Sequence, residues 1–532
     1  MRITHAAVLA AVAGFALATA READAQTFVS GTINWTDENN TNHAARRTWV
    51  EIWTTNLVGG DSMQARFQTD TRGQYAVDIG LPNPLHTASY LKVFAENDAA
   101  TVGDNNNPVN RYILTTPTGG SLGIGDNFLN LNIPHGSDAE KAMSVLDAMQ
   151  TGWDFAKDMR GGAGPAKVNV KFHDNAGTAY YAGTQRIGVV RGDAFDWDPV
   201  VHEYGHYATF GDNLAVSQPG AHQSGTSSIP TLGKQAGARM GYKEGIATWY
   251  SIASQNYKVG LNNVPTSAPR VGNTSYEDTD DLTISYDLEA SAPAAYRRTQ
   301  GEGDELATMR ILWDIGDKQG DRGFVNEAYD RVNRGQTQVY ADLKAAAAAQ
   351  GAPIKNLSQV WNYYYDLNGN GVSPTRDRWR TDFGAIFEAH DVSPHPTAVA
   401  GTTVDVSDIG ITFRWDRGNN DANETFKLII WRGDFERLYE SPLITTGTEF
   451  ELVGNGLALL QNQFLTFGAQ TFKFSILGGD LKNAAGTAYT GEELTSMYWS
   501  DAYSFMMVPA PASAALAGLG IVTILRRRRE RV

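Results

Sequence analysis

The five residues His202-Glu203-Tyr204-Gly205-His206 constrain the fold of this chain more than any other stretch of its sequence. Two histidines four residues apart point from one face of an α-helix, where both imidazoles can reach a single tetrahedral zinc ion. Glu203 lies beside them, in the position from which a carboxylate can take a proton from water at the metal. We therefore predict a helix over about 199–210, with Asp198 as its N-cap and Gly211 at its end.

A catalytic zinc site needs a third protein ligand and leaves one position for water. The chain contains no cysteine, so only histidine and carboxylate side chains can complete the site. We expect the third ligand to be Glu244, on a second helix over about 235–257 whose residues around Glu244 are mostly apolar. A carboxylate in such surroundings requires a partner, and a metal ion would provide one. Asp212 and His222 remain the other possible third ligands.

The combination of His202-Glu203-x-x-His206 with Glu244-Gly-x-Ala resembles the gluzincin clan of zinc metallopeptidases. The stretch Leu312-Trp313-Asp314-Ile315, on a later predicted helix, is also similar to secreted members of that clan. The resemblance covers about 190–320 and implies an endopeptidase that hydrolyses peptide bonds of a protein or peptide substrate. It implies Zn²⁺ held by His202, His206 and Glu244, with Glu203 as the general base.

The sequence departs from the clan's pattern at two positions near the expected third ligand. Lys243 stands where many relatives have Asn, and Thr248 stands where some have an Asp behind the ligands. The clan also uses a downstream Tyr or His to stabilise the oxyanion, and Tyr286 and Tyr296 are the candidates in this chain. The strand 187–190, which precedes the first helix, is expected to offer an edge to an extended substrate.

The regions on either side of this centre have the alternating pattern of short β-strands. Residues 26–135 resemble the transthyretin-like or carboxypeptidase-regulatory-like modules of secreted proteins. Residues 394–507 resemble a fibronectin type III-like sandwich with Trp415 as its buried ring. We therefore predict a multidomain protein, in which a central α+β zincin-like metallopeptidase domain over 136–393 lies between two all-β sandwich domains.

Both ends of the sequence have the pattern of targeting segments. Residues 1–25 combine a basic start, an apolar run and an Ala-x-Ala site, which is typical of a secretory signal peptide. Residues 508–532 combine prolines, the apolar run Ala514–Leu525 and four arginines, and they resemble a PEP-CTERM sorting signal with Ala510 in place of the usual Glu. The resemblance implies export, transient C-terminal membrane anchoring, processing by sorting machinery at the inner membrane, and a final place at the cell surface or outside.

The charge of the chain argues against one class of partner. Lys and Arg number 44 and Asp and Glu number 59, so the formal net charge is −15 and we expect no nucleic acid partner. A weaker pattern, Asp366-x-Asn368-x-Asn370-Gly371 with Asp377 at the twelfth place, is similar to a Ca²⁺ loop, although a plain Asn-Gly turn also explains it.

One function of another class is compatible with the same residues. A cell-surface adhesion or scaffold protein could keep a structural or vestigial zinc site between two sandwich modules. The approach of a Tyr or His to the metal distinguishes the two functions, because only the hydrolase needs a group that stabilises the oxyanion.

Overall fold

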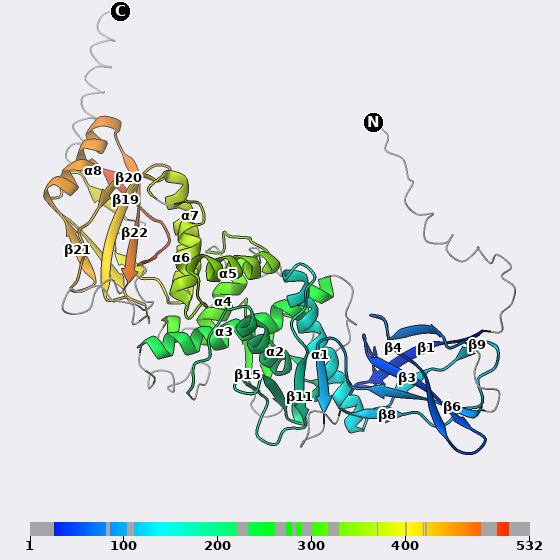
Figure 1. Ribbon diagram of the computed structural model, residues 1–532. Coiled ribbons are helices and arrows are strands. Elements are labelled where there is room, and N and C mark those ends of the chain that lie inside the picture. Colours follow the sequence, from blue (N-terminus) through cyan, green and yellow to red (C-terminus); the bar gives the residue numbers. More distant parts are fainter. Residues whose placement is uncertain are drawn as a thin grey trace, which may run out of the picture.

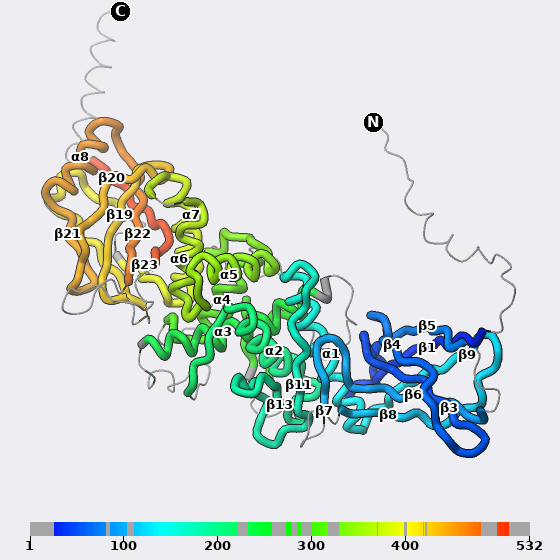
Figure 2. Tube along the Cα trace, in the orientation of Figure 1, coloured from blue at the N-terminus to red at the C-terminus, as the bar shows by residue number. Residues whose placement is uncertain are grey.

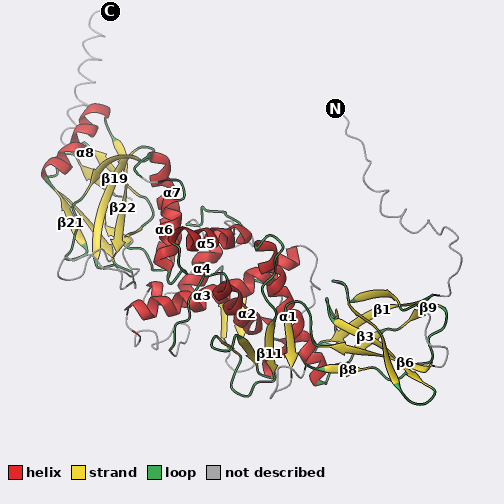
Figure 3. Cartoon of the chain, viewed as in Figure 1, coloured by secondary structure: helices red, strands yellow, loops and turns green. Residues whose placement is uncertain are grey.

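A computed structural model shows a mixed α/β chain with several separate sheets, and eight α-helices lie in its described part (Figures 1 and 3). Two β-rich regions lie at the two ends and a mainly helical region lies between them, consistent with a multidomain protein. The described residues are 26–80, 86–103, 111–220, 232, 234–260, 273–278, 284–289, 301–317, 329–369, 371–398, 402–418, 420, 423–479 and 497–509.

Two sheets form the N-terminal sandwich, as the alternating pattern predicts. Val29, Ile33 and Trp35 of the long first strand are fully buried between the sheets. The first sheet is built around β1 (Thr27–Thr36), which pairs with β2 (Asn42–Ala44), β5 (Gln74–Asp78), β9 (Gly125–Phe128) and β10 (Leu131–Ile133). The second sheet has the order β4 (Asp61–Gln68), β3 (Trp49–Asn56), β6 (His86–Phe94) and β8 (Ile113–Thr115).

The boundary expected near residue 135 does not separate the two regions cleanly. β7 (Ala100–Gly103) pairs in parallel with β11 (Val168–Phe172) and so belongs to the central sheet. That sheet has the order β12 (Ala179–Tyr181), β13 (Arg186–Val189), β11 and β7. The expectation that strand 187–190 offers a free edge is therefore wrong, because β13 is paired on both sides. β12 is the outer strand at this side of the described sheet.

The central region contains seven of the helices, and side-chain caps mark the starts of several of them. Ser137 and Glu140 form a capping box at the start of α1, and Asp304 accepts a hydrogen bond from the backbone of Leu306 at the start of α4. The helices are α1 (Asp138–Met159), α2 (Trp197–Gly211), α3 (Lys234–Gly260), α4 (Glu305–Gly316), α5 (Gln336–Gln350), α6 (Leu357–Asp366) and α7 (Pro374–Ala389). One continuous apolar core extends from the N-terminal sandwich through these helices.

The start of α2 differs from the prediction, since the helix begins at Trp197 and its N-cap is Asp196. Asp198 is buried inside the first turn instead of capping it. The side-chain amide of Gln255 donates to its Oδ1 at 2.8 Å, and the backbone N–H of Glu277 donates to its Oδ2 at 2.9 Å. Burial raises the pKa of Asp198 to about 8. This carboxyl group therefore joins α2 to α3 and to β14 (Ser275–Asp278).

The C-terminal sandwich has its own core, in which Trp415 is buried as predicted. It is not all β, because α8 (Gly454–Phe467) packs on it through Leu457 and Leu460. It is also not wholly antiparallel, because β17 (Thr403–Asp405) pairs with β24 (Tyr503–Val508) in parallel. One sheet has the order β16 (His395–Ala398), β18 (Ile411–Asp416) and β21 (Glu449–Leu452). The other has the order β17 (Thr403–Asp405), β24 (Tyr503–Val508), β22 (Gln470–Gly479), β19 (Thr425–Arg432) and β20 (Glu436–Glu440), with β23 (Met497–Trp499) beside β22.

Asp377, at the twelfth place of the possible Ca²⁺ loop, is held by side chains of the C-terminal sandwich. Arg437 donates to both oxygens of the Asp377 carboxylate, at 3.0 and 3.1 Å, and the indole N–H of Trp431 donates to one of them at 2.8 Å. This carboxylate therefore joins α7 to the C-terminal sandwich. Asn370 lies outside the described residues, as do the predicted signal peptide over 1–25 and nearly all of the predicted sorting segment, from residue 510 onward.

Candidate metal centre

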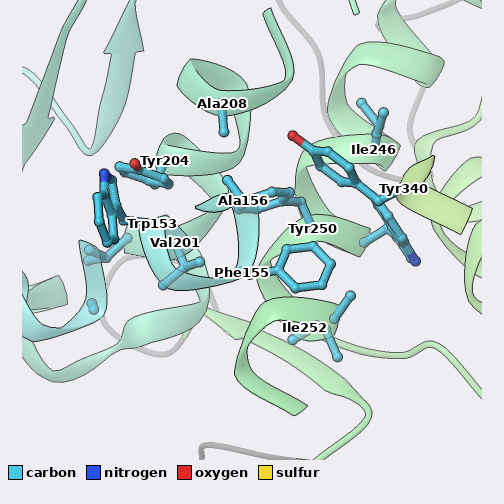
Figure 4. Close-up of a cluster of buried hydrophobic side chains, with 14 of the residues drawn as sticks. Trp153, Phe155, Ala156, Val201, Tyr204, Ala208, Ile246, Tyr250, Ile252 and Tyr340 are labelled. Carbon is cyan, nitrogen blue, oxygen red and sulfur yellow. The ribbon is translucent and has the colours of Figure 1, made fainter. Parts of the chain in front are cut away.

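Aromatic packing fixes how the helices of the candidate site lie against one another (Figure 4). Phe155 of α1 meets Tyr250 of α3 and Tyr340 of α5 edge to face, at ring-centroid distances of 5.3 and 5.7 Å. Val201 and Tyr204 of α2 are fully buried in the same cluster. Because a close-packed core tolerates little displacement, the relative positions of α1, α2 and α3 are well defined.

Two glycines allow the helix that carries Glu244 to approach its neighbours closely. A Cβ atom on Gly205 of α2 would lie 3.0 Å from the backbone oxygen of Ala247 in α3. A Cβ atom on Gly245 would lie 2.5 Å from the side chain of Thr308 in α4. The glycine inside the histidine motif and the glycine after Glu244 therefore serve the same purpose, which is to bring α3 between α2 and α4.

The structure brings His202, His206 and Glu244 together around one point. Glu244 Oε2 lies 3.2 Å from His202 Nε2 and 3.0 Å from His206 Nε2. Two atoms bound to a tetrahedral zinc at about 2.0–2.1 Å lie roughly 3.3 Å apart, so the observed spacing fits a shared ion. All three side chains are buried. Among the described residues, His202, Glu203 and His206 form a group whose ligand atoms lie within 4.8 Å of one another and which could hold a metal ion.

Thr248 takes the position behind His202 where some gluzincins have Asp. Its Oγ1 lies 3.0 Å from His202 Nδ1, and its side chain is buried one turn beyond Glu244 on α3. A hydrogen bond to Nδ1 fixes the orientation of the ring and leaves Nε2 as the atom available to a metal. Thr248 therefore supplies a hydrogen-bond partner for His202 that carries no negative charge.

The two histidines differ in their electrostatic surroundings. Burial works against the protonation of His202, but the hydrogen bond with Glu244 and the charges of Glu203 and Glu244 raise its pKa overall. Burial lowers the pKa of His206, and Glu244 offsets this only in part. Lys243 Nζ lies 2.6 Å from the other oxygen of Glu244, so the Lys that stands in place of Asn pairs with the expected ligand.

Glu203 is half-buried and points toward the outer strand of the central sheet. Its Oε2 accepts a hydrogen bond from the backbone N–H of Tyr180 in β12, at 2.6 Å. This bond orients the carboxylate beside the two imidazoles. It also ties the expected general base to the strand on which an extended peptide could add to the sheet.

Tyr276, which the sequence pattern does not indicate, lies against the candidate metal centre. Its ring centroid is 5.8 Å from that of His202, and it stacks on Tyr286 of β15 (Ile284–Asp287) at 6.5 Å. Burial, together with the charges of Asp278 and Glu203, raises the pKa of Tyr276 well above its usual value, so its hydroxyl keeps its proton. The short polar strand around it gives no sequence signal of this position. Tyr296 lies outside the described residues.

Of the alternative third ligands, Asp212 is not brought to the site. Asp212 Oδ2 accepts from Arg160 Nε at 2.9 Å and from the hydroxyl of Tyr340, so its carboxylate is engaged on another side of α2. His222 lies outside the described residues. Two cavities of about 400 and 430 Å³ lie between α6 or α7 and the C-terminal sandwich, and neither is lined by His202, Glu203 or His206.

No family model matches the chain, and no curated protein matches it. Among solved structures, a 9R-lipoxygenase from Cyanothece PCC8801 is similar over 26% of this chain at 9% sequence identity, with a TM-score of 0.15. This chain spans 24% of the lipoxygenase's length. A likeness this weak gives no information about the fold or about the candidate metal centre.

Proposed function

We propose that this chain is an exported zinc-dependent endopeptidase whose metal is held by His202, His206 and Glu244. The observation that carries the proposal is the position of Glu244 Oε2, 3.2 and 3.0 Å from the two imidazole nitrogens that project from the neighbouring helix. Three buried ligand atoms at this spacing, with a further carboxylate beside them, have the composition of a catalytic zinc site. The family resemblance of the motif supports the same function.

Zinc at this position would supply a Lewis acid that polarises the substrate carbonyl and makes a water molecule more acidic. Glu203 accepts a proton from that water as its oxygen bonds to the carbonyl carbon. Glu203 then delivers the proton to the amine nitrogen as the C–N bond breaks. Tyr276, which keeps its proton, is the candidate to donate a hydrogen bond to the oxyanion. Thr248 holds His202 in the orientation that this chemistry requires.

One contact favours the alternative function, an adhesion or scaffold protein with a structural or vestigial metal site. Lys243 competes with a metal for the Glu244 carboxylate, which lowers the charge available to the ion. The presence of Tyr276 beside His202 favours the hydrolase, because a purely structural site has no use for an oxyanion donor. Measured turnover decides between the two functions.

Export and transient membrane anchoring are part of the proposal and rest on the sequences of residues 1–25 and 508–532. Within the described residues, none of the helices combines the length and the apolar character needed to cross a bilayer. The sorting machinery at the inner membrane and a protein or peptide substrate are the proposed partners.

The test of the proposed function pairs metal content with activity. Zinc content and cleavage of casein are measured for the wild type and for Glu203→Gln, which keeps the size of the side chain but cannot accept a proton. We expect bound zinc in both proteins and cleavage by the wild type alone. Equal cleavage by the variant would remove Glu203 from the mechanism, and zinc without any cleavage in the wild type would favour the scaffold function.

A further inference from the structure

The larger of the two cavities beside the C-terminal sandwich has the size of a small-molecule site. It measures about 430 Å³ and is lined by residues of α6, α7 and the strands β19, β20, β22 and β23. Figure 2 shows α6 and α7 at the side of the sandwich that carries β22 and β23. Ligand sites in proteins commonly measure about 300–1,000 Å³ and often lie where two domains meet. The cavity is therefore large enough to hold a small organic molecule.

Two tryptophans of the cavity lining have indole N–H groups without a partner. Trp361 of α6 and Trp499 of β23 are each 1% exposed, and within the described part of the chain neither indole N–H donates a hydrogen bond. Two nearby tryptophans that do not line the cavity are bonded, since Trp431 donates to Asp377 and Trp379 donates to the backbone oxygen of Tyr364. A buried indole N–H usually finds an acceptor. A ligand in the cavity can supply acceptors for both unpaired groups.

The charged groups around the cavity balance one another. Lys427 and Arg437 donate to the two oxygens of Glu440, at 2.7 and 2.8 Å. Burial disfavours the charged form of Glu440, but its hydrogen bond and ion pair with Lys427 and the charge of Arg437 lower its pKa overall. Arg380 and Arg437 share the carboxylate of Asp377 at 3.0–3.3 Å. Three cations and three carboxylates make up the set: Lys427, Arg380, Arg437, Asp366, Asp377 and Glu440. A charged ligand would have to break these pairs, so the cavity favours a neutral one.

The rest of the lining combines aromatic surface with polar groups. The ring of Tyr365 lies 6.4 Å from that of Trp361 and 6.0 Å from that of Trp499, measured between centroids. Asn362 and Asp366 are exposed at the rim and lie one turn apart on α6. A neutral ligand for this lining needs apolar faces and many groups that donate and accept hydrogen bonds. A sugar ring meets both needs, because its faces carry C–H groups and its edge carries hydroxyl groups.

We propose that this cavity binds a short neutral saccharide. The indole N–H groups of Trp361 and Trp499 donate to sugar oxygens, Asn362 and Asp366 bind hydroxyl groups at the rim, and the ring of Tyr365 contributes to the apolar wall. The saccharide site is separate from the candidate metal centre and does not depend on the proposed catalysis. A bound glycan would hold the chain at a glycosylated surface without occupying the metal centre.

The test uses the full chain with ¹⁵N-labelled tryptophan and three neutral disaccharides: maltose, cellobiose and N,N′-diacetylchitobiose. Glutarate serves as an anionic probe. The indole N–H resonances of the 12 tryptophans are followed by NMR during each titration, and Trp361→Phe and Trp499→Phe assign the two resonances of the cavity. The double variant Asn362→Ala/Asp366→Ala changes only exposed residues of the rim, so it should fold. Asn462→Ala, which changes an exposed asparagine of α8, is the matched control.

We expect at least one disaccharide to shift the resonances of Trp361 and Trp499 in a saturable way, and the double variant to bind it about tenfold more weakly or worse. Asn462→Ala should bind like the wild type. Glu203→Gln should also bind like the wild type, which separates this site from the proposed catalysis. Unchanged binding in the double variant, shifts confined to other tryptophans, or no saturable shift with any of the three sugars would overturn the proposal. A stronger response to glutarate than to every sugar would show an anion site and would overturn it as well.

Discussion

Replacing Thr248 by Val tests whether a single hydroxyl group supports the metal centre. The substitution keeps the shape of the side chain and removes the oxygen that lies 3.0 Å from His202 Nδ1. Both side chains are buried, so water cannot easily replace the lost partner. A buried polar group without a partner costs about 1–3 kcal/mol, and loss of an outer partner of a metal-bound histidine typically weakens metal binding about 10- to 100-fold. We expect a loss of zinc affinity in this range.

The assay is competition for zinc against a chromophoric chelator, with two matched controls. Thr248→Ser restores the hydroxyl and should bind zinc within a few-fold of the wild type. Thr209→Val makes the same change on α2, where the hydroxyl of Thr209 donates to the backbone oxygen of Gly205 at 2.7 Å, and should leave zinc affinity unchanged. Wild-type affinity in Thr248→Val would refute the role of this hydroxyl, and equal losses in both valine variants would show a general packing effect.

Three further predictions test the surroundings of the site. The variant Tyr276→Phe should still bind zinc, but its kcat should be about 100-fold lower or more, because the oxyanion loses one hydrogen-bond donor. Tyr286→Phe should change kcat little, and the opposite ranking of the two variants would assign the donor to Tyr286. Gly245→Ala should lower the free energy of unfolding in urea by about 1–3 kcal/mol, because the new methyl group would lie 2.5 Å from the side chain of Thr308 in α4. Gly211→Ala should be tolerated, because the atom nearest to its new methyl group, in the side chain of Arg160, lies 3.6 Å away. Burial lowers the pKa of His390 to about 3, so the unfolded chain takes up a proton near pH 6.5 that the folded chain does not, and stability falls as pH falls below 6.5. This part of the pH slope between pH 7 and pH 5 should disappear in His390→Gln, and an unchanged slope would contradict the prediction.

The parts of the site that follow from local spacing could be predicted from the sequence. Helical periodicity gave the helices around His202 and His206 and around Glu244 to within a few residues. The apolar residues beside Glu244 indicated a buried carboxylate, and the structure places it against both rings. The helices and the burial of Glu244 are encoded by local periodicity, whereas its contact with both rings depends on the packing of α3 against α2.

The parts that depend on distant contacts could not be predicted. Asp198 has the composition and position of an N-cap, but its oxygens are taken by Gln255 and by the backbone of Glu277, far along the chain. Tyr276 reaches His202 only because β14 packs against α2. β7 joins the central sheet from within the N-terminal region through parallel pairing, which leaves no signal in the strand's own sequence.

The helix α8 is a further element in which the structure differs from the prediction. Its residues Leu457, Leu460 and Phe464 are spaced three to four apart, which is a helical period, but the strands on either side favoured an all-β reading of the whole region. The segment has no charged residue and a face that stays exposed, so its amphipathic pattern is weak.

The most direct test of the proposed centre is zinc-edge X-ray absorption of the purified full chain. The account predicts one zinc ion with a four-coordinate shell of nitrogen and oxygen atoms at about 2.0–2.1 Å, which includes two imidazoles. In Glu244→Ala this shell should be lost or should lose one protein ligand. A shell with no imidazole, or an unchanged shell in Glu244→Ala, would contradict the claim that His202, His206 and Glu244 bind the metal.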